Sequence, residues 1–400
     1  MEEIKKILDF IDRVGLYPDI KAISGSATPE VVINGRKTLL FSSNSYLGIA
    51  SSDKLKQAGI DAINKYGIGT AGARLLSGNL EIHVQVEKEI AKFKHCDDAI
   101  VFNTGYMTNV GAISAVMNLP KIGPSSFFKG TGIIFSDELN HASIIDGCKL
   151  SNASVIIYKH VDMKDLEGKL RWQRKRRKLI ITDGVFSMDG DIAPLDKIAE
   201  LAKKYKAMVM VDDAHATGVL GKNGSGTPEH FNLTQDDIDI MMGTLSKALA
   251  GAGGYVAGKK DLIRYLRVTS RPYIFSTSMP ASNSAAVIAA IREIKDHPEL
   301  IRRLWENANQ LREGFKERGF NTLKSQSQII PVLIGEEKKA IEAARILFER
   351  GFFAPCVRWP AVAKGQARIR FTVMASHSEH QINLLLDEFS KISKELGIIN

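Results

Sequence analysis

The sequence has only three cysteines among its 400 residues, and they are far apart. An odd number at such spacing matches neither a disulfide framework nor a zinc site, so we expect reduced thiols and no metal. No apolar stretch approaches the roughly 18–20 residues that cross a bilayer. Residues 1–20 also lack the apolar core and small-residue cleavage site of a signal peptide. We therefore expect a cytoplasmic protein without a membrane span.

The chain also lacks internal repeats, low-complexity tracts and flexible linkers. Its apolar fraction of 44% and charged fraction of 25% are ordinary for a globular protein. The formal net charge of +9 suits nucleic acid or an anionic small molecule such as a coenzyme-A ester. The densest basic run, 171–178 (RWQRKRRK), follows a helical pattern, and basic residues are favourable in the last turn of a helix. We interpret it as a solvated helix end and expect no nucleic-acid partner.

Short β-rich runs alternate with helical patterns through the middle of the chain. Several runs are apolar on both faces, as are the strands of a mostly parallel sheet that helices cover. The sequence therefore predicts an α/β architecture with a seven-stranded sheet. The predicted strands are 99–103, 132–136, 154–158, 178–182, 207–212, 238–244 and 253–258.

A change of pattern near Asn283 divides the chain. Long helical patterns and two strand patterns follow it, which predicts a smaller C-terminal α+β domain. An amphipathic helix opens the chain, with Ile4, Ile7, Leu8 and Ile11 on one face. We predict an N-terminal helix and arm (1–50), a large domain (51–285) and a small domain (286–400). Residues 119–131 form a loop of irregular composition, either a lid or a long surface loop.

Residues 67–72 (GIGTAG) match the dinucleotide-binding pattern G-x-G-x-x-G. That pattern requires a preceding strand, whereas residues 55–66 (LKQAGIDAINKY) are helical in pattern. The sequence therefore favours an ordinary glycine-rich loop over a nicotinamide site.

Polar residues gather where three of the predicted strands end. Ligands collect outside the carboxyl ends of strands in open α/β sheets, so these residues are expected to line one crevice. Pyridoxal phosphate requires a lysine for the imine, an acid for the pyridine nitrogen and donors for the phosphate. Lys247, Asp212 and the hydroxyls of Thr244 and Ser246 meet these needs, and His215 can face the same ring.

Four segments, GTLSKALAGAGGY, VDDAHATGVLG, TDGVFSMDG and DELNHASIIDG, together resemble the α-oxoamine synthase family of fold-type-I pyridoxal-phosphate enzymes. The resemblance runs from about Phe41 to the C-terminus. It implies a fold-type-I transferase with pyridoxal 5'-phosphate as cofactor. It further implies that Lys247 is the imine lysine and the acid–base, Asp212 pairs with the pyridine nitrogen, and His141 stacks on the ring.

The same resemblance assigns the remaining cofactor residues. His215 and Ser187 would hydrogen-bond near the phenolic oxygen of the ring. The phosphate would bind Thr244 and the backbone N–H groups of Gly105 and Tyr106, at a predicted helix start that favours anions. In this family, Ser276 and Thr277 would reach the phosphate of the neighbouring subunit, which implies a homodimer with shared active sites.

A guanidinium fork suits the carboxylate of the amino-acid substrate. Arg370 matches the family's carboxylate-binding position, with Asn44 nearby, and Arg358 is a second candidate. We expect Arg368, which is close by on the same predicted strand, to point the other way.

The family resemblance implies a decarboxylating condensation of an amino acid with an acyl-CoA or acyl-carrier-protein thioester. Several segments, including YKHVDMKDLE, resemble 8-amino-7-oxononanoate synthases, which use L-alanine and a pimeloyl thioester in biotin biosynthesis. Others, such as SRPYIFSTS, resemble glycine C-acetyltransferases, and a serine palmitoyltransferase-like synthase is a further alternative. Residues 358–361 read RWPA where the oxononanoate synthases usually have RPPT, so the acyl specificity stays open. An aminotransferase on the same fold, with no acyl-CoA, is the hypothesis from a different class.

Overall fold

The computed structural model describes residues 1–13, 17, 19–119, 132–173 and 177–399. Most of the predicted loop 119–131 and residues 174–176 of the basic run lie outside this described part. None of the described helices is long and apolar enough to cross a membrane.

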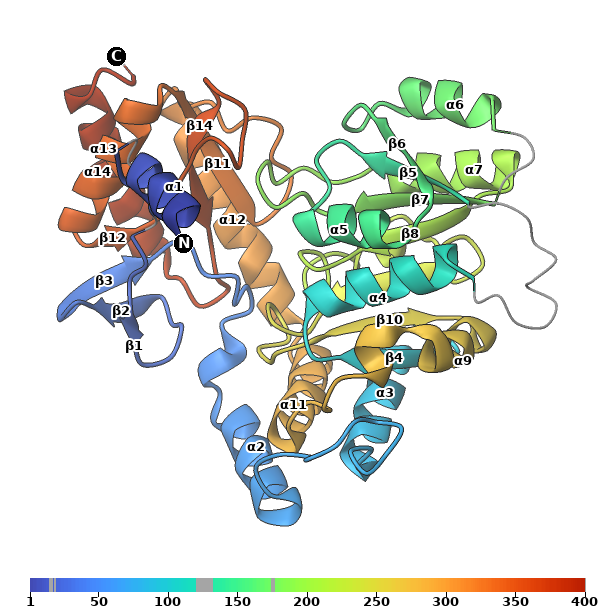
Figure 1. Ribbon diagram of the computed structural model, residues 1–400. Coiled ribbons are helices and arrows are strands. Elements are labelled where there is room, and N and C mark those ends of the chain that lie inside the picture. Colours follow the sequence, from blue (N-terminus) through green and yellow to red (C-terminus); the bar gives the residue numbers. More distant parts are fainter. Residues whose placement is uncertain (14–16, 18, 120–131, 174–176, 400) are drawn as a thin grey trace.

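A seven-stranded sheet forms the centre of the larger lobe (Figure 1). Its strand order is β4-β10-β9-β8-β7-β5-β6, and only β10 runs antiparallel to its neighbours. The predicted mostly parallel sheet is therefore confirmed. The strands are β4 (Asp98–Phe102), β5 (Ile133–Asp137), β6 (Ser154–Tyr158), β7 (Lys178–Asp183), β8 (Met208–Asp212), β9 (Ile240–Thr244) and β10 (Gly254–Gly258).

Helices cover both faces of this sheet, which explains why its strands read as continuous apolar runs. Leu179 and Ile181 pack on one side with α4, α5, α9 and α10, whereas Ile180 packs on the other with α3, α6, α7 and α11. Strand β6 lies at the sheet edge and leaves Val155 and Ile157 exposed. The helices of this lobe are α3 (Glu81–Phe93), α4 (Gly105–Met117), α5 (Ala142–Leu150), α6 (Met163–Arg171), α7 (Leu195–Tyr205), α8 (Thr227–His230), α9 (Lys260–Thr269), α10 (Arg271–Ile274) and α11 (Ala281–Asp296).

The C-terminal part contains a three-stranded antiparallel sheet in the order β11-β14-β13, packed against long helices. Phe315, Phe371 and Phe389 are fully buried at the junction of α12, β14 and α14, where their rings contact one another. The predicted α+β composition of this part is confirmed. Its elements are α12 (Glu299–Glu317), β11 (Ile329–Gly335), α13 (Glu337–Glu349), β13 (Cys356–Val357), β14 (Ala367–Thr372) and α14 (Glu379–Glu395).

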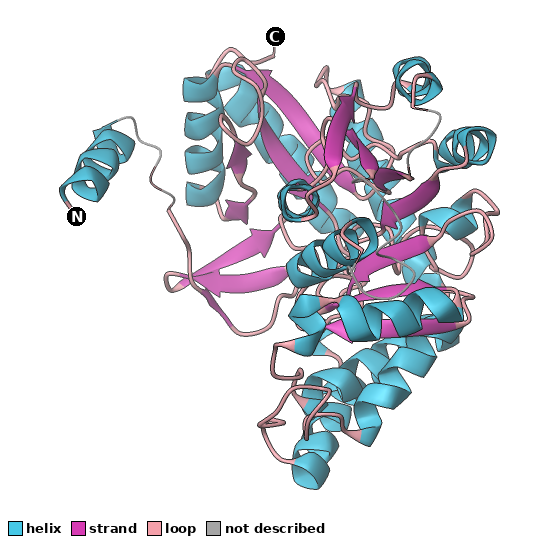
Figure 2. Ribbon diagram, turned by 45° about the vertical axis from the view of Figure 1, so that its right-hand side comes forward, coloured by secondary structure: helices cyan, strands magenta, loops and turns pink. Residues whose placement is uncertain are grey.

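The N-terminal segment lies beside the C-terminal part rather than beside the large sheet (Figure 1). Its strands β1 (Ile23–Ser24), β2 (Glu30–Ile33) and β3 (Arg36–Leu40) form a sheet with β12 (Phe352–Phe353), which is parallel to β3. The predicted first helix is present as α1 (Glu2–Arg13), but Ile4, Ile7 and Leu8 of its apolar face are exposed. Figure 2 shows α1 standing away from the rest of the chain.

The short helix η1 (Ile49–Ser51) and helix α2 (Asp53–Tyr66) connect this segment to the large lobe. Helix α2 ends directly before Gly67, so a helix and not a strand precedes the G-x-G-x-x-G pattern, as predicted. The domain boundaries at residues 50 and 285 stay predictions.

Candidate active site

The carboxyl ends of β5, β7, β8 and β9 open onto one pocket, as the strand-end argument predicted. Residues that are more than 140 positions apart in the sequence meet there. Eight of the ten predicted cofactor residues line it, among them all four predicted catalytic residues. The lining residues are Gly105, Tyr106, Asn109, His141, Ser143, Asp183, Ser187, Asp212, Ala214, His215, Met242, Thr244, Ser246 and Lys247.

Lys247 follows β9 and points into this pocket. Burial lowers the pKa of its amine to about 8, against the opposing charges of Asp212 and Asp183. The Arg370 guanidinium lowers it further. A lysine with this pKa is uncharged in a substantial fraction of molecules near neutral pH, and only the uncharged amine is a nucleophile.

Asp212 ends β8 and is 3% exposed. Asn109 Nδ2 donates to its Oδ2 at 2.7 Å, and the backbone N–H of Ala214 donates to its Oδ1 at 2.9 Å. Asp183 ends the adjacent strand β7, paired in register with Asp212. Burial, together with the neighbouring charge of Asp212, raises the pKa of Asp183. Two carboxyl groups with different hydrogen-bond partners therefore share the floor of the pocket.

His215 lines the same pocket, and Tyr46 contacts its ring. The Tyr46 hydroxyl lies 2.6 Å from His215 Nδ1 and 3.0 Å from Asn44 Oδ1. Burial lowers the pKa of His215 well below its usual value, and the positive charges of Lys247 and Arg370 act in the same direction. His215 is therefore neutral and oriented by a buried phenol. Asn44, a predicted substrate residue, does not line the pocket but accepts this hydrogen bond from Tyr46.

His141 caps the N-terminus of α5. Its Nδ1 lies 2.7 Å from Ser143 Oγ, and its backbone N–H donates to Asp183 Oδ2 at 3.0 Å. Ser143 in turn accepts a hydrogen bond from Asn109, the residue that also binds Asp212. These hydrogen bonds hold the His141 ring at the wall of the pocket.

The N-terminus of α4 closes another side of the pocket. Gly105 is its first residue, Thr104 caps it, and Gly105 and Tyr106 line the pocket beside Thr244 and Ser246. A Cβ atom on Gly105 would lie 3.3 Å from Thr244 Oγ1, so glycine permits this close approach. Backbone N–H groups at the start of a helix, next to two hydroxyls, form an anion-binding cradle.

Arg370 lies on β14 and donates from Nε to the backbone oxygen of Ser187 at 2.5 Å. Arg368 contacts the same loop, through an ion pair of 2.7 Å with Asp189. Our expectation that Arg368 points away from Arg370 is wrong, because residues two apart in a strand share a face. Arg358 follows β13 and does not line the pocket.

Ser276 and Thr277 lie outside the pocket, in a separate cavity shared with Arg74 and Asn103. Asn103, two residues before Gly105, donates to the backbone oxygen of Thr277 at 2.6 Å. The exposed ring of Phe275 is adjacent in sequence. Within one chain these two residues therefore do not complete the anion cradle.

Three residues that the sequence analysis did not single out contact the predicted ones. Asn109 is one helical turn after Gly105, and Asp183 ends a predicted strand, so both positions carried a signal. Tyr46 had none, since it meets His215 across 169 positions of sequence.

Comparisons with known proteins agree with this geometry. The family model described as aminotransferase class I and II matches residues 36–389. A curated 8-amino-7-oxononanoate synthase from Thermoanaerobacter pseudethanolicus is 46% identical, over 100% of this chain and 98% of the relative. The chain belongs to the α-oxoamine synthase family.

Solved structures extend this relationship to the fold. A serine palmitoyltransferase from S. paucimobilis with a bound PLP–myriocin aldimine has a TM-score of 0.91 and 34% identity, covering 100% of this chain and 98% of that one. An 8-amino-7-oxononanoate synthase from Francisella tularensis has a TM-score of 0.76 and 30% identity, covering 90% and 98%. The predicted fold-type-I transferase fold is therefore confirmed.

Proposed function

We propose that the protein is an 8-amino-7-oxononanoate synthase, which condenses L-alanine with a pimeloyl thioester and releases carbon dioxide. The observation that carries this proposal is the buried Lys247 amine in a pocket floored by Asp212, in a chain 46% identical to a curated enzyme of that name. The product is a precursor in biotin biosynthesis.

Pyridoxal phosphate fits the residues present. The anion cradle at α4 suits its phosphate, Asp212 suits a protonated ring nitrogen, and Lys247 is placed to bond its aldehyde carbon. The bound cofactor supplies an electron sink for negative charge at the substrate Cα. Gly105, Tyr106, Thr244 and the residues around Lys247 hold it.

Lys247 moves the proton in this proposal. Its free amine would remove the substrate Cα proton and later return one, for which a pKa of about 8 is well matched. Asp212, which accepts a hydrogen bond from Asn109, would hold the protonated ring nitrogen. His141 would stack on the ring face, and neutral His215 and Ser187 would hydrogen-bond at its phenolic oxygen.

Arg370 binds the substrate carboxylate in this proposal, with Asn44 nearby, and Arg358 is a second candidate for the substrate site. The position of Arg370 next to both Lys247 and His215 supports this role. A carboxylate held there orients the Cα–H bond toward the Lys247 amine.

The functional unit that we propose is a cytoplasmic homodimer with shared active sites. Ser276 and Thr277 would complete the phosphate site of the neighbouring subunit. Their distance from the pocket of their own chain supports this assignment, as do the exposed side chains of Phe275 and Leu76.

A synthase that uses serine or glycine with a different acyl-CoA is the second candidate. Two observations favour it: the higher TM-score to a serine palmitoyltransferase, 0.91 against 0.76, and the sequence Arg358-Trp359-Pro360-Ala361 in place of RPPT. Sequence identity favours the first candidate, since relatives at 43–46% carry the oxononanoate synthase name.

A substrate panel separates these functions. Alanine, glycine and serine are each combined with acetyl-CoA, pimeloyl-CoA, pimeloyl carrier protein and palmitoyl-CoA, and free thiol is followed with a chromogenic reagent. We expect the highest kcat/KM for alanine with a pimeloyl thioester, and a product mass lacking one carbon dioxide. Preference for glycine or serine would establish the second candidate, and amino-group transfer without thiol release would identify an aminotransferase.

A further inference from the structure

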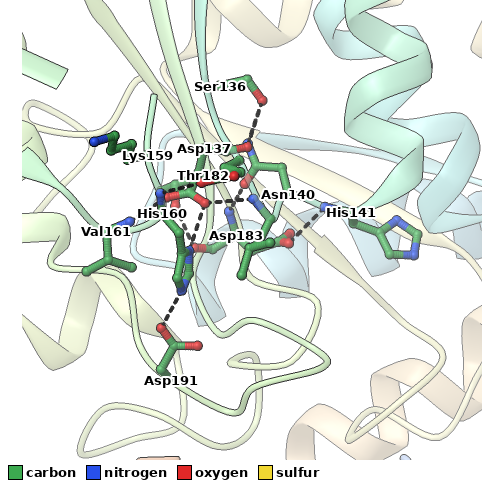
Figure 3. Close-up of polar contacts among 12 residues, drawn as sticks. Ser136, Asp137, Asn140, His141, Lys159, His160, Val161, Thr182, Asp183 and Asp191 are labelled. Carbon is green, nitrogen blue, oxygen red and sulfur yellow. Dashed lines mark hydrogen bonds and ion pairs between the residues drawn. The ribbon is translucent and has the colours of Figure 1, made fainter. Parts of the chain in front are cut away.

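His160 lies between two carboxylates outside the pocket described above (Figure 3). Its Nδ1 is 2.9 Å from Asp137 Oδ1, and its Nε2 is 2.8 Å from Asp191 Oδ2. The Asp137 and Asp191 side chains are only 1% and 9% exposed, and the Phe186 ring lies perpendicular to the imidazole, with 4.4 Å between the ring centroids. Since ionised carboxylates only accept hydrogen bonds, both ring nitrogens must donate.

A ring that donates from both nitrogens is a cation. Burial lowers the pKa of His160, but the hydrogen bonds and charges of Asp137 and Asp191 outweigh this effect and raise the pKa to about 10. Other charged groups near the ring are Glu138, which accepts from the His160 backbone N–H, and Lys316 and Lys324, which share a surface cavity with it. Asp137 and Asp191 are the groups that hydrogen-bond to the ring nitrogens, so their charges dominate.

The bridge joins three segments that are distant in sequence. Asp137 ends β5 and also accepts from the backbone N–H groups of Leu139 and Val161, each at 2.9 Å. His160 follows the edge strand β6. Asp191 belongs to the loop after β7, where its backbone oxygen accepts from Phe186.

One route leads from this bridge to His141. Asp137 fixes the turn that begins at Leu139, and the next residue, Asn140, donates to Ser136 Oγ and accepts from the Asp183 backbone N–H at 2.9 Å. His141 then donates its backbone N–H to Asp183 Oδ2. In Figure 3 the His141 ring points away from this network. The hydrogen bond between His160 and Asp137 therefore helps to fix the position of His141.

A second route leads to Arg370. The loop that ends at Asp191 carries Ser187, whose backbone oxygen accepts from Arg370 Nε, and Asp189, which pairs with Arg368. The hydrogen bond between His160 and Asp191 therefore helps to fix the position of the loop that Arg370 contacts.

We propose that His160 is a positioning residue, which acts as an imidazolium that ties Asp137 to Asp191 and thereby aligns His141 and Arg370 in the active site. It contacts neither substrate nor cofactor. Its effect passes through the two loops that it joins.

The ionisation of His160 is tested directly by NMR on the full protein with ¹³C-labelled histidine. The His160 signal, assigned by its loss in His160→Gln, should stay that of an imidazolium from pH 6 to pH 9. Asp191→Asn should lower its pKa. A His160 signal that titrates near its ordinary value of about 6.5 would overturn the proposal.

Thermal unfolding gives a second readout that does not depend on catalysis. A group whose folded pKa is raised contributes stability that is complete below its unfolded pKa and is lost as pH rises to the folded value. The Tm difference between the wild type and His160→Gln should therefore be largest near pH 6 and shrink toward pH 10. A difference that is the same at both pH values would contradict a charged bridge.

Kinetics test the alignment itself, and this arm alone rests on the proposed function. His160→Gln should raise KM for L-alanine about tenfold, roughly the effect of one displaced charge-assisted hydrogen bond, and lower kcat less. His297→Gln is the matched control, because His297 also lies between two carboxylates, Glu293 and Glu299, but on the surface. Its KM should stay within about twofold of the wild type.

The outcomes separate the two proposals. If the wild type does not release thiol, the proposed function fails, whereas NMR and thermal unfolding still decide whether His160 is a charged bridge. If the wild type is active and His160→Gln leaves KM for alanine unchanged, the positioning role is wrong.

Discussion

His215 and His160 have opposite electrostatic environments, although both belong to the same lobe. Burial lowers the pKa of His215, which hydrogen-bonds to the Tyr46 hydroxyl, and the positive charges of Lys247 and Arg370 lower it further. His160 faces two carboxylates, and its pKa is raised to about 10. The charge of a histidine is thus decided by its partners as well as by its burial.

The comparison extends to the regions around them. In the pocket, Lys247 and Asp183 have shifted pKa values, a pattern typical of sites that move protons. At the bridge, one imidazolium is hydrogen-bonded between two carboxylates, a pattern typical of a rigid support. The pocket around Lys247 has the properties of a reactive site, and the His160 bridge has those of a structural support.

The largest expected effect comes from Lys247. Lys247→Ala should abolish both activity and the visible absorbance of lysine-bound pyridoxal phosphate, because no other described lysine lines the pocket. Lys259→Ala, which removes a surface lysine paired with Asp236, should change neither. Absorbance spectra and thiol release measure both properties, and a Lys247→Ala protein that keeps them would refute the role.

Arg370 should show the next largest effect. Arg370→Ala should raise KM for the amino acid by about 10- to 100-fold, the range for a lost charge-assisted hydrogen bond. Arg368→Ala is the matched comparison, since both arginines rest on the same loop. Steady-state kinetics would show the wrong arginine was chosen if KM rose more in Arg368→Ala.

The pH dependence of stability sharpens the contrast between the two histidines. Folded His215 stays neutral, whereas the same histidine in the unfolded chain takes up a proton below its ordinary pKa of about 6.5. Acid therefore favours the unfolded chain and lowers the free energy of unfolding by up to about 1.4 kcal/mol per pH unit. Urea unfolding of His215→Gln between pH 5 and 7 should therefore show a shallower loss of stability than the wild type. His380→Gln, at an exposed position on α14, should keep the wild-type slope; identical slopes in all three proteins would contradict a neutral His215.

The smallest expected effect is at Val161, which has a φ of 56°. A β-branched residue rarely adopts this left-handed conformation, which costs about 1–2 kcal/mol, whereas asparagine tolerates it. Val161→Asn should therefore raise the free energy of unfolding by about 0.5–1 kcal/mol, measured in urea. Val155→Asn, on the exposed edge strand β6, should not; a loss of stability in both variants would argue against strain at Val161.

The sequence predicted the sheet well because its strands are buried on both faces. All seven runs became strands within two residues of the predicted ends. The strand order and the reversed direction of β10 were not predictable, since they depend on pairings between distant segments. The exposed apolar face of α1 was also unexpected, because periodicity predicts a helix without showing what covers it.

The site was predictable where residues follow strands, and less so elsewhere. Lys247, Asp212, His215 and His141 meet in one pocket, as expected from strand ends and family resemblance. The contacts that orient them come from Tyr46, Asn109 and the His160 bridge. These contacts join segments up to 169 positions apart, and no local pattern encodes them.

The most direct test of the account is chemical identification of the cofactor lysine. The holoenzyme is reduced with borohydride, which fixes the cofactor to whichever amine it bonds, and the digested protein is mapped by mass spectrometry. We predict that the pyridoxyl group is found on Lys247. A pyridoxyl group on a different lysine, or on none, would contradict it.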